Sequence, residues 1–180
     1  RLATFHAQHD NMSVLVVQPQ TIYNEFSSGT QDISAIRDFV KMMWHRSGPG
    51  SQPRYLLLFG DASYDPMERI SGNSNFIPVF QSVESLHPVN SYATDDFFGC
   101  IDDNEGGQSS DVLDIGVGRL PVQTHEEAVM AVDKMIHYAT ATDKVNGDWR
   151  NIIAFVADDE DGNDHMEQAD MIATMIDTTY

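Results

Sequence analysis

The residues best placed for chemistry are two aspartates that each follow an apolar run. Asp61 comes directly after Phe59-Gly60, and Asp158 comes directly after Val156-Ala157. If both runs are parallel strands, their carboxyl ends lie at the edge of the sheet where ligands of open α/β proteins bind. Carboxylates at that edge are well placed for catalysis. The alternative is that each aspartate only caps backbone N–H groups of its turn.

A second candidate site is the acidic run from Asp158 to Asp164. It supplies several carboxylates and one glycine within seven residues, and such oxygen ligands suit calcium. The run departs from the EF-hand pattern, because with Gly162 at the sixth loop position the first and twelfth positions carry no acid. A structural calcium ion held by Asp159 and Asp161 therefore remains an alternative. We expect no required cofactor.

Three other chemistries are less favoured by the residues. Cys100 is the single cysteine and has acids on both sides of its apolar stretch. Carboxylates raise a thiol pKa, so we expect a core residue rather than a nucleophile. The glycines of Gly116-Val117-Gly118 lie within a predicted strand and lack the third glycine of a dinucleotide loop. His6 and His9 form a pair without a third ligand, which argues against zinc.

Composition narrows the class of protein. The chain has 180 residues, of which 41% are hydrophobic, which is typical of a globular domain with a proper core. Its formal net charge is -18, from 28 Asp and Glu against 10 Lys and Arg. Surfaces that bind phosphates carry the opposite sign, so nucleic acid is not an expected partner. No apolar run approaches the ~20 residues of a membrane span, and no signal peptide is visible.

The apolar patterning predicts an α/β fold. We expect three layers, with a mainly parallel sheet of about four core strands, helices on both faces and a small β-hairpin region. The predicted core strands are residues 14–17, 55–59, 113–120 and 152–156. Two further strands are predicted at 76–80 and 96–101, flanking a polar connection. Residues 1–12 are interpreted as an irregular linker or strap, and residues 13–180 as a single subdomain.

Helical spacing predicts the elements between the strands. Residues 22–26 form a short helix, and residues 32–45 form a longer one with Asp32 at its N-terminus. Thr124 and Glu127 have the spacing of a capping box, so a helix starts there. A final helix begins near His165.

Several short motifs, taken in order, carry a resemblance that no single one of them would support. The matching segments are Val17-Gln18-Pro19, Ile22 to Gly29, Gln31-Asp32 with Ala35 to Phe39, Leu57 to Asp65, Ile77-Pro78 with Gln81-Ser82, Thr94 to Gly99, Asp114 to Val122, Ala157 to Asp159, and His165 with Gln168 to Asp170. Together they cover nearly the whole chain. Their order resembles the first half of the catalytic domain of gingipain-like cysteine peptidases, most closely the sortases (C-terminal signal peptidases) of type IX secretion.

The resemblance implies a caspase-like fold of two side-by-side subdomains, of which this chain matches the N-terminal one. In such peptidases the catalytic His and Cys belong to the second subdomain. We therefore expect them beyond Tyr180 and expect this segment alone to be inactive. The resemblance makes Asp158 the acid that orients the catalytic His. It also places Asp164 and His165 near the pocket for the substrate's P1 side chain.

The resemblance also implies partners and a location. The expected partners are protein or peptide substrates, the second catalytic subdomain of the same parent chain, and components of the secretion system, with no nucleic acid and no membrane span in this segment. The expected location is extracytoplasmic, at the outer membrane or cell surface. An alternative from a different class is a calcium-dependent scaffold or binding module related to the peptidase subdomain.

Overall fold

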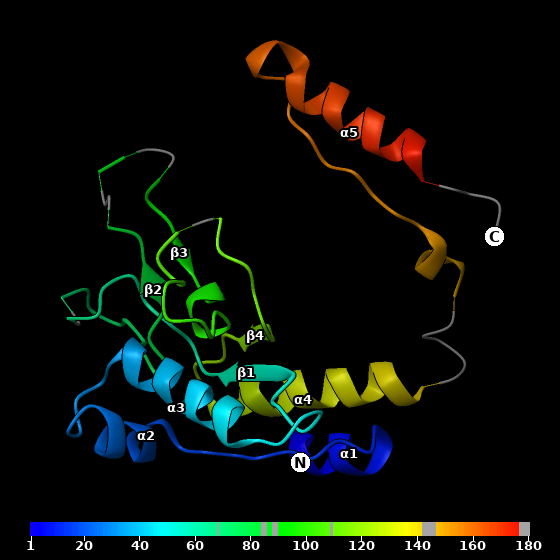
Figure 1. Cartoon of the computed structure of the whole chain (residues 1–180). Helices are drawn as coiled ribbons and strands as arrows, with labels where there is room; N and C mark the ends of the chain where they lie inside the picture. Colours follow the sequence, from blue (N-terminus) through cyan, green and yellow to red (C-terminus); the bar gives the residue numbers. More distant parts are fainter. Residues whose placement is uncertain (68, 84–85, 88–89, 109, 142–146, 177–180) are drawn as a thin grey trace. The chain divides into compact units, whose positions relative to one another are not determined.

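The computed structural model describes residues 1–67, 69–83, 86–87, 90–108, 110–141 and 147–176 (Figure 1). The chain divides into two compact units, Arg1–Ile136 and His137–Tyr180, and the division falls within helix α4, His125–Thr140. The single subdomain over residues 13–180 stays a prediction. No helix in the described part of the chain is long and apolar enough to cross a membrane.

A parallel pair of strands forms the centre of the first unit (Figure 1). Strand β1, Tyr55–Phe59, pairs with β4, Gly116–Leu120, in a register that places Tyr55 opposite Gly116. Gly116 permits this approach, because a Cβ there would lie 3.0 Å from the Tyr55 ring. The predicted α/β class is confirmed, and so are these two strands, although β4 begins at Gly116 rather than at residue 113.

Helices α2 and α3 pack together and cover one face of this pair (Figure 1). Helix α2, Pro19–Phe26, begins with proline at its first position, and α3, Ile33–Arg46, is capped by Asp32, whose carboxylate accepts the Ser34 N–H at 2.8 Å. The core between helices and strands contains Ile22, Tyr23, Ala35, Ile36, Leu58, Ile77 and Phe98. On the opposite face of β1, the side chains of Tyr55, Leu57 and Phe59 are 39–69% exposed.

The segment before α2 differs from its prediction twice. Residues 1–12 are not irregular, since Leu2–His9 form helix α1. A helix satisfies its own backbone hydrogen bonds, so a polar segment with one buried leucine can form it. Residues 14–17 do not form a strand, and Val14, Leu15 and Val16 are 42–76% exposed. A strand needs a hydrogen-bonding neighbour, and among the described residues β1 pairs with β4 alone.

The predicted hairpin region is present but shorter than expected. Strands β2, Phe80–Gln81, and β3, Ala93–Thr94, pair antiparallel. The predicted strand at residues 96–101 is wrong, because Asp96–Phe98 form the 3₁₀ helix η1. The Phe98 N–H donates to the Asp95 carbonyl and the Gly99 N–H to that of Asp96, and these local bonds replace a strand ladder.

Helix α4 begins after Thr124, whose hydroxyl accepts the Glu127 N–H at 3.1 Å, as the capping box predicts.

The second unit contains the final helix, α5. In the second unit the 3₁₀ helices η2, Asp148–Asn151, and η3, Asp161–Asn163, precede α5, Asp164–Met175. The predicted strand at residues 152–156 is not formed, because no neighbour pairs with it in the described part of the chain, and Val156 is 95% exposed.

Candidate functional site

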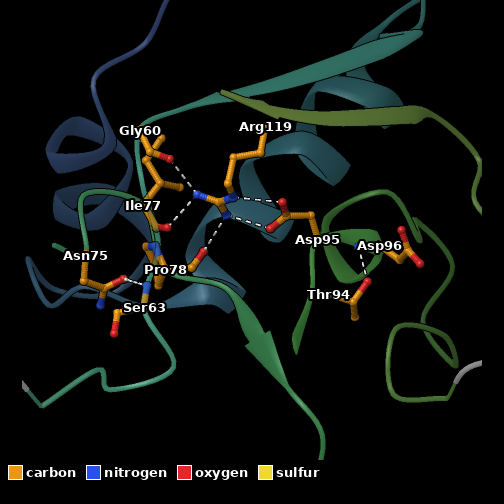
Figure 2. A network of polar contacts seen from close by, with 9 residues as sticks. All are labelled: Gly60, Ser63, Asn75, Ile77, Pro78, Thr94, Asp95, Asp96 and Arg119. Atoms are coloured by element: carbon orange, nitrogen blue, oxygen red, sulfur yellow. Dashed lines mark hydrogen bonds and ion pairs between the residues drawn. The ribbon is translucent and has the colours of Figure 1, made fainter. Parts of the chain in front are cut away.

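Arg119, at the end of β4, is the centre of a polar network in the first unit (Figure 2). Its Nε and Nη2 donate to the two carboxylate oxygens of Asp95 at 2.8 and 2.6 Å. Its Nη1 donates to the carbonyls of Gly60 at 2.9 Å and Ile77 at 2.8 Å, and Nη2 also donates to that of Pro78 at 3.2 Å. The guanidinium thus uses all five of its N–H groups within the fold.

This network gives Arg119, in strand β4, a structural role. The Arg119 side chain is 11% exposed and joins the ends of β1 and β4 to the start of η1. With every donor occupied, Arg119 is not available to bind a substrate anion. Sequence reasoning missed its pairing with Asp95. The available signals were an arginine in a predicted buried strand and the adjacent acids Asp95 and Asp96.

Asp61 is the first of the two aspartates that follow apolar runs, and its carboxylate is occupied. Oδ2 accepts the Ser74 hydroxyl at 2.6 Å and the Gln123 side-chain amide at 2.7 Å. The Ser74 hydrogen bond is the main reason that the pKa of Asp61 lies below its ordinary value, with smaller contributions from Gln123 and the Ala62 N–H. Asp61 is therefore bonded within the fold, but mainly to two distant side chains rather than to the backbone N–H groups that the capping alternative describes.

Asp158 is the second of these aspartates, and its surroundings are different. It lines a cavity of about 470 Å³ in the second unit. The other lining residues come from the extended segment before η3 and from α5, and are Phe155, Val156, Ala157, His165, Gln168, Ala169 and Ile172. In the described part of the chain, the Asp158 carboxylate makes no hydrogen bond or ion pair. Asp158 is thus exposed and available.

The turn between Asp158 and α5 has a local cause. Gly162 and Asn163 have φ values of 73° and 72°, in the left-handed region that glycine and asparagine tolerate. The chain then enters α5 at Asp164, whose negative charge suits the positive end of the helix dipole. This turn places His165 on the first turn of α5, beside the cavity.

The predicted site residues are thus partly brought together. Asp158 and His165 line the same cavity, whereas Asp164 and Asp159 do not line it. The His165 Nε2 lies 3.7 Å from Asp161 Oδ2, one helical turn earlier, and both side chains are more than half exposed. No three His, Cys, Asp or Glu side chains converge as a metal site requires, within the residues that the structure describes. Calcium at Asp159 and Asp161 stays a prediction.

Cys100 lies in the core, as its sequence context predicts. It is 2% exposed, and its Sγ is 3.4 Å from the Asp96 carbonyl to which it donates. Burial raises the pKa of the thiol, and Glu105 and Asp111 add to the effect. A buried thiol with a raised pKa is a poor nucleophile.

Comparison with known proteins identifies what the chain is similar to. The family model described as Peptidase family C25 matches residues 1–180. The crystal structure of dimeric latent PorU from Porphyromonas gingivalis matches with a TM-score of 0.66 and 35% sequence identity. The match covers 92% of this chain and 16% of the PorU chain, so this chain spans about a sixth of that protein. A search of curated proteins found no match.

Proposed function

Because the chain belongs to peptidase family C25, the gingipain family, we propose that it forms the first subdomain of the catalytic domain of a PorU-type cysteine endopeptidase. The observation that carries the proposal is the family match over all 180 residues, together with 35% identity to PorU. The substrates are proteins, cleaved or transferred at the cell surface. The partners are the second catalytic subdomain of the same protein and components of its secretion system.

The nucleophile and the catalytic histidine come from another part of the longer protein. In that mechanism a cysteine thiolate attacks the peptide carbonyl carbon, and the histidine protonates the leaving amine. A water or an acceptor amine then releases the acyl group from sulfur. Cys100 does not suit the role of nucleophile, since it is 2% exposed and burial raises its pKa.

Asp158 acts as a positioning residue in this proposal. Its carboxylate accepts an N–H of the catalytic imidazole, which selects the tautomer and stabilises the imidazolium that forms during the reaction. Two observations support the role: Asp158 lines a cavity, and its carboxylate has no other partner in the described residues. Asp61 does not suit it, because its carboxylate already accepts two side-chain hydrogen bonds.

His165 and Asp164 contribute to recognition of the substrate's P1 side chain. His165 lines the cavity that contains Asp158, and Asp164 precedes it at the start of α5. This arrangement supports a P1 pocket adjacent to the positioning residue.

The test of the proposal is the Asp158→Asn variant of the longer enzyme. Loss of the carboxylate should lower kcat roughly 100-fold or more and change the pH–rate profile, because the imidazolium loses its counter-charge. The matched control is Glu160→Gln, which removes an exposed carboxylate that does not line the cavity. An unchanged kcat for Asp158→Asn, or an equal loss for both variants, would contradict the role of Asp158.

The family assignment also predicts the behaviour of the isolated chain. The 180 residues alone should not turn over peptide substrates. Turnover that Cys100→Ala abolishes would show instead that this chain carries its own nucleophile.

A further inference from the structure

A second cavity lies in the first unit, and none of the residues proposed above for catalysis or P1 recognition lines it. It has a volume of about 350 Å³ and is bordered by the β2–β3 hairpin, η1 and the loop after it. Its lining includes three aromatic rings, Phe80, Tyr92 and Phe97, and two carboxylates, Asp96 and Asp111. A volume of this size accommodates one side chain or a small molecule.

The aromatic wall of this cavity already binds one cation of the chain itself. The rings of Phe80 and Phe97 stack with centroids 5.0 Å apart and planes 14° apart. The Arg37 guanidinium carbon lies 5.0 Å from the centroid of Phe97, which is a cation–π contact. Phe97 is therefore already in contact with Phe80 and Arg37, and the lining rings left to contact a ligand are those of Phe80 and Tyr92.

The adjacent acids Asp95 and Asp96 have separate surroundings. Asp95 is paired with Arg119, whereas the Asp96 carboxylate points away from Arg119 (Figure 2). The Asp96 N–H donates to the Thr94 hydroxyl at 3.1 Å, which orients the residue at the start of η1. No hydrogen bond or ion pair reaches the Asp96 carboxylate from the described residues. Asp96 therefore presents an unpaired charge at the cavity.

Asp111 adds a second negative charge that is held in place. Its Oδ2 accepts the N–H groups of Gly106, Gly107 and Gln108 at 2.8, 3.1 and 3.0 Å. These bonds, that from Gln108 most of all, hold the pKa of Asp111 below its ordinary value, so the carboxylate is ionised at neutral pH. Arg37 does not pair with either acid, because its Nε and Nη2 donate to the carbonyls of Cys100 and Asp102.

We propose that this cavity binds the cationic side chain of a lysine or arginine in a peptide. The aliphatic stem of such a side chain packs on Phe80 and Tyr92, and its charged end meets Asp96. Two carboxylates against the single charge of Arg37 leave an excess of negative charge, which disfavours an anionic ligand. The proposal concerns binding alone and does not depend on peptide cleavage.

The experiment measures binding of three probes to the 180-residue chain by calorimetry: N-acetyl-lysine amide, N-acetyl-arginine amide and the neutral N-acetyl-norleucine amide. The cationic probes should bind saturably, less tightly at high salt, and at least roughly fivefold tighter than the norleucine probe. Asp96→Asn should weaken binding of the cationic probes by roughly fivefold and leave the norleucine probe unaffected.

Two further variants make the result decisive. Asp38→Asn is the matched control, since it removes an exposed carboxylate of α3 that does not line the cavity, and it should bind as the unaltered chain does. Ala93→Leu places a larger side chain at the cavity wall and should abolish binding of the cationic probes. This variant tests the cavity independently, so the proposal remains testable if Asp96→Asn does not fold. Thermal unfolding of each variant reports its fold. The proposal is overturned if the unaltered chain binds no cationic probe, if the norleucine probe binds equally well, or if Ala93→Leu binds as tightly as the unaltered chain.

Discussion

Asp61 and Asp158 hold equivalent positions in the sequence, each after an apolar run, but the two regions around them differ. The run before Asp61 is strand β1, which pairs with β4 along its whole length. The run before Asp158 is unpaired in the described part of the chain, and Val156 is 95% exposed. The first aspartate is bonded to Ser74 and Gln123, whereas the second lines a cavity and has no such partner among the described residues.

The difference shows that an acid after an apolar run can be hydrogen-bonded within the fold or can remain available to a ligand. Where the run is paired in a sheet, the loop that follows it and the residues after the neighbouring strand supply donors, as Ser74 and Gln123 do for Asp61, and the acid becomes part of the scaffold. Where donors are absent, the acid keeps its bonding capacity for a ligand or a second subdomain. The contrast between Asp95 and Asp96 has the same form, since Arg119 occupies the Asp95 carboxylate, whereas no described residue pairs with that of Asp96. The predictions below test this contrast between scaffold and available groups.

The largest effect on stability is expected at Arg119. Arg119→Ala leaves Asp95 and three backbone carbonyls without their donor, so the free energy of unfolding should fall by about 4 kcal/mol. Urea denaturation measures this loss. Arg54→Ala is the control, because the Arg54 side chain is exposed and makes no such contacts with the described residues, and it should change the stability by less than about 0.5 kcal/mol. Similar losses for both variants would contradict a scaffold role specific to Arg119.

The paired and unpaired runs should differ in their sensitivity to truncation. Leu58 in β1 is 3% exposed, so Leu58→Ala should lower the free energy of unfolding by about 3 kcal/mol. Val156 is 95% exposed, so Val156→Ala should cost less than about 0.5 kcal/mol in the isolated chain. Chemical denaturation of the two variants side by side decides the matter. A cost at Val156 comparable with that at Leu58 would show that the second run is packed in solution.

A smaller effect, with a defined pH dependence, is expected at Asp61. Asp61→Asn should reduce the stability by about 1 kcal/mol at neutral pH, since it weakens the hydrogen bonds from Ser74 and Gln123. The folded-state pKa of Asp61 lies below its ordinary value, so this stabilisation is present above the ordinary pKa and is lost as the pH falls through the lowered one.

The matched variant for Asp61 is Asp158→Asn. At neutral pH this variant should change the stability by less than about 0.5 kcal/mol, because the Asp158 carboxylate has no partner in the described residues. Thermal unfolding between pH 3 and pH 7 measures the pH dependence for Asp61→Asn. If the difference between Asp61→Asn and the unaltered chain stays constant down to pH 3, the carboxylate of Asp61 is not the source of the stabilisation.

Much of the fold follows from local signals in the sequence. Helix α3 was predicted within a residue of its bounds, because apolar residues recur at helical spacing after Asp32, which caps the helix. The start of α4 followed in the same way from Thr124 and Glu127. These signals are reliable because they depend on residues three or four positions apart, which a helix brings together whatever surrounds it.

The errors occurred where an element needs a distant partner. Residues 14–17 and 152–156 have the composition of buried strands, but composition supplies no hydrogen-bonding neighbour, and in the described residues neither run has one. The predicted strand at 96–101 failed for the opposite reason, since local bonds after Thr94 form a 3₁₀ turn. The role of Arg119 was also out of reach, because its partners lie 24 to 59 positions away in the chain.

By itself, the sequence determined the α/β class, the family, the buried state of Cys100 and the two acids that follow apolar runs, Asp61 and Asp158. Only the tertiary structure decided which of those acids is bonded and which is available. The physical reason is that a carboxylate's role depends on which donors come within about 3 Å of it. For Asp61 those donors are Ser74 and Gln123, 13 and 62 positions away, and for Asp158 the described chain supplies none.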